Sequence, residues 1–220
     1  MDFFTSHSQS INQRYVESFS SMRTGILLLL IGSLMISIAF IGFLISILIP
    51  GLSLYRTPVI TDEILLLLGI LGVLSITGSI ISIIGLFSKL MPGVSKLAEI
   101  DSRFSTASTL IKIGYITGFI LLIIGFALLI VIIGIFIILI GAIFVLIGEI
   151  GFIVLCFNLN DAERDSLYLT AGILFILGLF IFILSIIGWI LLYMALGHSI
   201  DKRSKQPSSF LYTPTPPPPI

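Results

Sequence analysis

The fold is decided by residues 113–157, which read IGYITGFILLIIGFALLIVIIGIFIILIGAIFVLIGEIGFIVLCF. These forty-five residues contain one charged side chain, Glu149. A single helix of that length would reach roughly 68 Å at about 1.5 Å per residue, whereas the hydrocarbon core of a bilayer is roughly 30 Å thick. The run therefore predicts two membrane-spanning helices that fold back on each other, and we expect the division near Gly134.

The composition of the whole chain supports a membrane environment. The 220 residues have a mean hydropathy of +1.23, and 10% are charged, against about a quarter in soluble proteins. The formal net charge is zero, so we expect no nucleic-acid partner. One cysteine, Cys156, and two histidines cannot assemble a zinc or iron–sulfur cluster, so we expect no metal and no cofactor.

The remaining apolar runs complete an all-α, polytopic bundle of about five spans. Pro50 and Gly51 end the first run, because proline cannot donate to a continuing helix. Asp62 and Glu63 begin the second, where the helix dipole favours negative charge. The sequence therefore predicts an N-terminal segment, a transmembrane bundle over 25–197 and a disordered Pro-rich tail at 198–220. The predicted spans are 25–49, 64–87, 111–133, 135–157 and 167–196.

Two segments have the periodicity of amphipathic helices at the membrane surface. Apolar residues recur every three or four positions in 94–110 and again in 11–22, within the N-terminal segment 1–24. Each of these two segments is either a juxtamembrane helix that only positions the span that follows it, or a surface helix with a separate function. The Pro-rich tail is either solvated or a docking motif.

Lysine and arginine positions predict the orientation. With five spans, seven of these residues fall on the side of the N-terminus and four on the other, so the positive-inside rule predicts a cytoplasmic N-terminus and an external C-terminus. If the chain has one more or one fewer crossing, the tail joins the N-terminal side and the ratio becomes ten to one. Either way we expect an integral protein of the cell membrane, in contact with the lipid bilayer.

Glu149 is the candidate polar site. An ionised carboxylate in hydrocarbon costs at least a few kcal/mol unless it is paired or protonated. Folding about Gly134 places Glu149 near Thr117 and about a turn and a half from Lys112, so Thr117, Lys112 or water would satisfy it. Two hypotheses stay open: a site that binds a proton or cation, and a structural carboxylate between helices.

Small residues recur through both helices of the long run. Gly114 and Gly118 form a GxxxG pair, and further glycines follow at seven-residue steps. Such faces let membrane helices approach closely. We predict helix packing through this face, either inside the molecule or between copies or partners, with the residues Gly114, Gly118, Gly125, Gly134, Gly141 and Gly148.

No enzymatic constellation is found in the sequence. It has no HExxH motif, no paired histidines for haem and no base beside the serines of the first two spans. We therefore expect a non-enzymatic scaffold or accessory subunit of a membrane assembly, which includes a homo-oligomer. The alternative is a small proton-coupled transporter or channel component that uses Glu149.

The second half of the chain resembles a known family. The resemblance is carried by IKIGYI at 111–116, IGEIGF at 147–152 and IGWILLY at 187–193. Together these segments resemble the archaeal membrane family catalogued as domain of unknown function 973, over roughly residues 25–197. The resemblance implies an archaeal multi-pass membrane protein of unassigned role and adds no catalytic residues.

Overall fold

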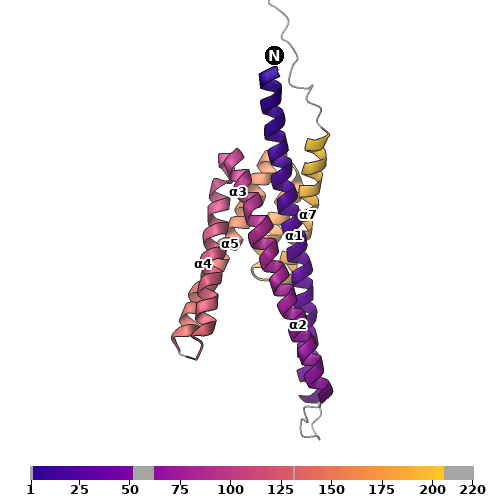
Figure 1. Cartoon of the computed structure of the whole chain (residues 1–220), viewed down its shortest axis with the longest axis vertical. Helices are drawn as coiled ribbons and strands as arrows, with labels where there is room; N and C mark the ends of the chain where they lie inside the picture. Colours follow the sequence, from indigo (N-terminus) through magenta and orange to yellow (C-terminus); the bar gives the residue numbers. More distant parts are fainter. Residues whose placement is uncertain (1, 52–61, 131, 206–220) are drawn as a thin grey trace, which may run out of the picture. The chain divides into compact units, whose positions relative to one another are not determined.

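The computed structural model describes residues 2–51, 62–130 and 132–205, and every regular element within these ranges is a helix (Figure 1). Five of the described helical stretches are long and apolar enough to cross a membrane, which confirms the all-α fold and the number of long apolar helices. These stretches are Ile11–Ser46, Asp62–Ile100, Ser102–Ala127, Ile133–Glu163 and Ile183–Ser204.

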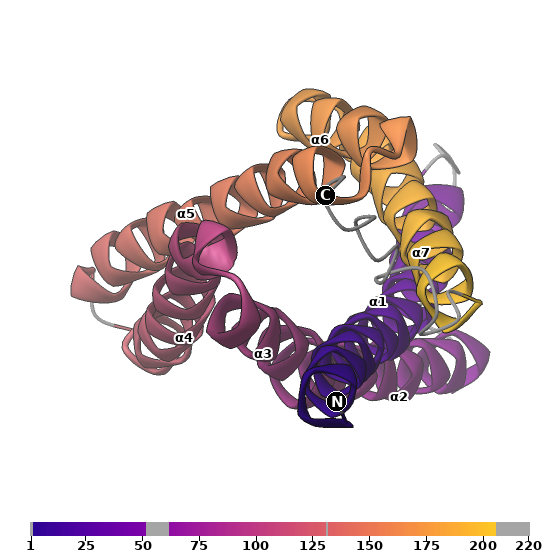
Figure 2. The same cartoon turned by 90° about the horizontal axis from the view of Figure 1, so that it is seen from above.

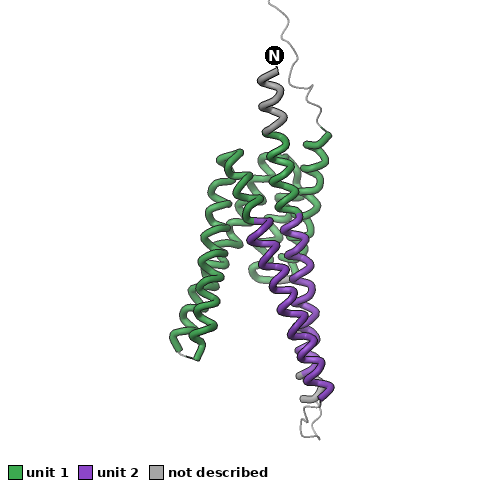
Figure 3. Tube along the Cα trace, in the orientation of Figure 1, with its two compact units in different colours: residues 1–23, 91–220 green, residues 24–90 purple. Residues whose placement is uncertain are grey.

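The elements follow one another with short connections. In chain order they are α1 (Asp2–Gly51), α2 (Asp62–Ile84), a π-helical segment η1 (Gly85–Leu90), α3 (Met91–Ile100), a 3₁₀ turn η2 (Ser102–Phe104), α4 (Ser105–Ala127), α5 (Ile133–Glu163), α6 (Ser166–Gly178) and α7 (Phe182–Ser204). The N-terminal amphipathic segment is continuous with the first apolar run in α1. The chain divides into two units, residues 24–90 and residues 1–23 with 91–220 (Figure 3).

The unit of residues 24–90 is an antiparallel helix pair held by glycines. A Cβ at Gly32 would lie 2.5 Å from the carbonyl oxygen of Gly78, and one at Gly25 would lie 2.8 Å from the carbonyl oxygen of Gly85. The two glycine pairs are seven residues apart on each helix, so one bare face repeats every two turns. Close backbone approach therefore joins α1 to the α2–η1 helix here.

The other unit contains two helical hairpins, α4 with α5 and α6 with α7, together with α3 and the N-terminal part of α1. Figures 1 and 2 show α4 alongside α5 in both views. Large side chains without solvent exposure come from the N-terminal part of α1, from α3, η2 and the start of α4, and from the C-terminal half of α5. They include Phe19, Met22, Leu97, Phe104, Ile111, Phe152, Leu155 and Leu159.

The turn of the first hairpin precedes the predicted position. α4 ends at Ala127 and α5 begins at Ile133, so the chain reverses just before the division that was predicted near Gly134. Gly134 lies instead in the first turn of α5, where a Cβ would come within 2.7 Å of the carbonyl oxygen of Gly125. The glycine serves helix contact, and the turn itself is made of large apolar residues.

The predicted single span 167–196 is two helices. α6 ends at Gly178 and α7 begins at Phe182, and the two run antiparallel, since the Oη of Tyr168 and the Oγ of Ser199 are 2.8 Å apart. Small residues allow the reversal: a Cβ at Gly178 would lie 2.8 Å from the backbone nitrogen of Ser185. The hydropathy of the run concealed this turn, because no polar residue marks it.

The predicted interfacial helix 94–110 is also interrupted. Asp101 has an extended backbone (φ −139°, ψ 115°) and caps η2, so α3 ends at Ile100 and residues 105–110 belong to α4. The side chain of Asp101 accepts a hydrogen bond from the backbone N–H of Arg103, which competes with continuation of the helix. The predicted tail contributes residues 198–204 to α7, and residues 206–220 lie outside the described part.

Candidate functional site

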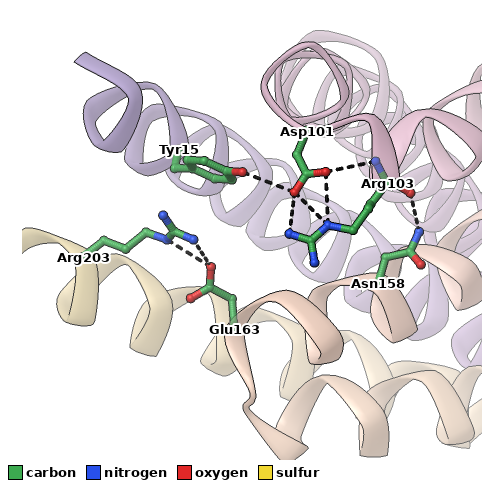
Figure 4. A network of polar contacts seen from close by, with 6 residues as sticks. All are labelled: Tyr15, Asp101, Arg103, Asn158, Glu163 and Arg203. Atoms are coloured by element: carbon green, nitrogen blue, oxygen red, sulfur yellow. Dashed lines mark hydrogen bonds and ion pairs between the residues drawn. The ribbon is translucent and has the colours of Figure 1, made fainter. Parts of the chain in front are cut away.

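Four parts of the larger unit meet in a cluster of polar side chains (Figure 4). They are the N-terminal part of α1, the α3–α4 junction, the end of α5 and the end of α7. We call these residues the polar cluster: Tyr15, Asp101, Arg103, Asn158, Glu163 and Arg203. None of them was among the predicted site residues.

The most enclosed contact of the polar cluster joins α5 to α7. The Nε of Arg203 donates to the Oε1 of Glu163 at 3.0 Å, and its Nη2 forms a second, shorter contact with the same oxygen. The Glu163 side chain is 4% exposed and that of Arg203 19%. The guanidinium also lies over the ring of Tyr15, 4.1 Å from its centroid, and donates to the Oδ1 of Asn12 at 3.2 Å. This pair therefore connects α1, α5 and α7.

These contacts also decide on which side the C-terminal helix ends. Arg203 lies one residue before the end of α7, and both Asn12 and Tyr15 lie near the start of α1. The N-terminal part of α1 and the end of α7 are thus at the same end of this unit, whereas the predicted five-span arrangement placed the two termini on opposite sides. The α6–α7 hairpin is the reason, because it supplies the additional reversal.

The second part of the polar cluster is the cap at Asp101. Its carboxylate accepts hydrogen bonds from the Nε of Arg103 at 2.9 Å and from the Nη2 at 2.6 Å. These bonds hold the pKa of Asp101 below its ordinary value, against the opposing effect of partial burial. Asn158 donates to the backbone carbonyl of Arg103 at 2.8 Å, so the same turn is fastened to α5.

Two further ion pairs lie on the outside of this region and connect α1 to α3. Lys96 and Glu17 are 2.6 Å apart, and Arg14 and Glu99 are 3.7 Å apart. All four side chains are about half exposed or more. Exposed pairs of this kind contribute about 0–1 kcal/mol each, so they add less than the enclosed pair.

The predicted candidate, Glu149, has a partner that depth alone did not identify. The Oη of Tyr115 donates to the Oε1 of Glu149 at 2.6 Å. Lys112 is exposed and takes part in none of the described ion pairs, and the half-buried Thr117 has no described hydrogen bond to Glu149. The sequence feature that could have identified Tyr115 is the glycine at position 148. A Cβ at Gly148 would lie 2.6 Å from the Tyr115 ring, so only the absence of a side chain there leaves room for the ring beside Glu149.

Aromatic rings continue from this hydrogen bond across the unit. Tyr115 contacts Phe152 at 5.7 Å between ring centroids, and Phe152 meets the edge of Trp189 at 4.9 Å. Trp189 in turn contacts Phe175 at 4.8 Å. Edge-to-face pairs of this kind contribute beyond the area that they bury. The chain of rings therefore joins α4, α5, α7 and α6.

The six predicted packing glycines all lie at the contact of α4 with α5. A Cβ at Gly114 would lie 2.5 Å from the Cα of Gly148, and one at Gly118 would lie 3.1 Å from the carbonyl oxygen of Gly141. Gly125 and Gly134 face each other in the same way near the turn. The structure thus places these glycines inside the molecule, where they bring two backbones together.

Among the described residues, no group of three or more His, Cys, Asp or Glu side chains is placed to hold a metal ion. The thiol of Cys156 is buried in α5.

Comparison with known proteins gives one family. The family described as "Protein of unknown function (DUF973)" matches residues 15–220. No curated protein and no solved structure matches the chain.

Proposed function

The chain belongs to the family described as "Protein of unknown function (DUF973)", and from this premise we propose that it is a multi-pass protein of the cell membrane. Its role in this proposal is that of a non-enzymatic scaffold or accessory subunit of a membrane assembly. The observation that carries the proposal is the enclosed ion pair of Glu163 with Arg203, which joins the end of α5 to the end of α7. A pair used in this way holds helices together.

The proposed orientation places the N-terminus and the end of α7 in the cytoplasm. Arg203 contacts Asn12, so the N-terminal part of α1 and the end of α7 belong to one side. Of the eleven lysines and arginines, all except Arg56 then lie on that side. Such an excess is typical of the cytoplasmic face. An archaeal source stays a prediction from the family resemblance.

The scaffold proposal is tested by the mass of the native particle. The chain is purified from its own membranes in a mild detergent and weighed by native mass spectrometry after cross-linking in the membrane. We expect a stoichiometric complex well above the 24.0 kDa of one chain, either with copies of itself or with another protein. A homogeneous 24.0 kDa monomer before and after cross-linking would contradict the proposal.

A second candidate function is proton coupling at Glu149. The hydrogen bond from Tyr115 favours it, since a carboxyl group with one hydroxyl partner, in an apolar span, has the chemistry of a proton-binding site. The test is proton-dependent flux in proteoliposomes. Glu149→Gln should abolish such flux and Tyr115→Phe should alter it, whereas equal flux in wild type and Glu149→Gln would eliminate this candidate.

A further inference from the structure

Arg23 lies where the N-terminal part of α1 ends and its long apolar run, from Gly25, is about to begin. Its guanidinium lies over the ring of Tyr193 on α7, with Cζ 4.5 Å from the ring centroid. One turn further along α7, Gly197 leaves the neighbouring space open: a Cβ there would lie 3.2 Å from the same Cζ. The face of the Tyr193 ring and the space left by Gly197 together form a flat surface against which the guanidinium lies.

This guanidinium lies against a supporting surface but has no anionic partner among the described residues. Its Nε is enclosed and has no hydrogen-bond partner among the described residues, and no described carboxylate lies within 4.0 Å of it. By contrast, Arg14, Arg103 and Arg203 each have a carboxylate partner. An arginine keeps its charge at physiological pH, and an enclosed donor without an acceptor is costly. Arg23 therefore has the features of one half of an ion pair.

The position of Arg23, Tyr193 and Gly197 along their helices indicates which anion would pair with Arg23. Arg23 lies two residues before an apolar run, and Gly197 lies a turn before the charged residues at the end of α7, so both are at the depth of the membrane interface. The anions found at that depth are the phosphate groups of lipids. Among the described residues, the Nε of Arg23 is the one enclosed side-chain polar atom without a hydrogen-bond partner.

We propose that Arg23, seated on Tyr193 and Gly197, binds the phosphate group of an anionic membrane lipid between α1 and α7. The planar guanidinium presents two parallel N–H donors, the geometry that recognises phosphate. The ring of Tyr193 orients the plane of the Arg23 guanidinium by a cation–π contact. The lipid would complete the contact between the first and the last helix of this unit.

The test uses the full chain in detergent, titrated with short-chain phosphatidylglycerol and, separately, phosphatidylcholine, with bound lipids counted by native mass spectrometry. Wild type should retain one phosphatidylglycerol more tightly than any other lipid. Arg23→Gln should weaken this site by about tenfold or more, which is the effect of losing a charged hydrogen bond. The matched control is Arg14→Gln on the same helix, whose arginine is exposed and already paired with Glu99, and it should bind as wild type does.

A second variant keeps the test decisive if Arg23→Gln does not fold. Gly197→Leu retains Arg23 but fills the space beside its guanidinium, and it should also lose the tight lipid. Equal binding by Arg23→Gln and wild type would overturn the proposal, and so would equal losses in Arg23→Gln and Arg14→Gln, which indicate unspecific attraction. Displacement of the lipid by inorganic phosphate at equal concentration would assign the site to a soluble anion instead.

Discussion

Replacing Arg203 with methionine should destabilise the protein more than any other single substitution in the polar cluster. The change leaves the carboxylate of Glu163, which is 4% exposed, without the guanidinium that donates two hydrogen bonds to it. Breaking an enclosed ion pair from one side costs about 3–5 kcal/mol. Arg203 is itself 19% exposed, so water can reach part of the site, and we expect the lower end, about 3 kcal/mol.

The measurement is thermal unfolding in detergent, followed by circular dichroism at the helix band. In a chain of this length, 1 kcal/mol corresponds to about 2–4 °C, so the midpoint of Arg203→Met should fall by about 6–12 °C. The matched control is Lys202→Met, which removes one hydrogen bond to the backbone carbonyl of Glu163 and should lower the midpoint by no more than about 4 °C.

The double variant separates the pair from general packing. Because the cost in Arg203→Met comes from an unpaired carboxylate, removing that carboxylate as well, in Glu163→Leu with Arg203→Met, should recover part of the loss. Equal midpoints for wild type and Arg203→Met would refute the reasoning. Additive losses in the double variant would do the same, since they would show that the two side chains act independently.

Three further predictions concern the helix contact, the cap and the orientation. Gly114→Leu should lower the unfolding midpoint strongly, because its Cβ alone would lie 2.5 Å from the Cα of Gly148. The control Gly69→Leu should change the midpoint little, since a Cβ at Gly69 meets nothing within 4 Å. Equal effects of the two substitutions would contradict the packing at Gly114. Asp101→Ala should cost about 0.5–2 kcal/mol near neutral pH. Since the folded pKa of Asp101 is lowered, the wild-type advantage exists above the unfolded value near 4 and disappears as the pH falls below it, and an advantage that grows in acid would exclude the pairing with Arg103. With Cys156 replaced by alanine, cysteines introduced at positions 12 and 205 should react with an impermeant maleimide from the same side of sealed vesicles, and reaction from opposite sides would reject a shared side.

Much of the candidate chemistry was visible in the sequence, but its partners were not. Glu149 stands out because it is the one charge in a forty-five-residue apolar run. Its partner, Tyr115, depends on how α4 and α5 are rotated and shifted relative to each other, and the contact at Gly148 sets both. Residue numbers along the two helices predict only how deep a side chain lies in the membrane, not which way it points. The prediction from depth therefore named Thr117 and Lys112 as partners instead.

The polar cluster was not predicted because its members are far apart in the chain. Glu163 and Arg203 are separated by 40 residues, and Tyr15 and Asp101 by 86. Each looks alone like an ordinary polar residue at a helix end. Only the reversal after Gly178 returns α7 to the beginning of α1, and an apolar run of that length is equally compatible with one long helix.

The sequence by itself determined the class of protein, because hydropathy and length are properties of local composition: an all-helical chain, long apolar helices, and a hairpin with glycines on its inner face. The tertiary structure alone decided where the hairpins turn, which side holds the end of α7, and which charges pair. These depend on contacts between distant residues, above all the small-residue contacts at Gly134 and Gly178, whose geometry no local pattern of hydropathy encodes.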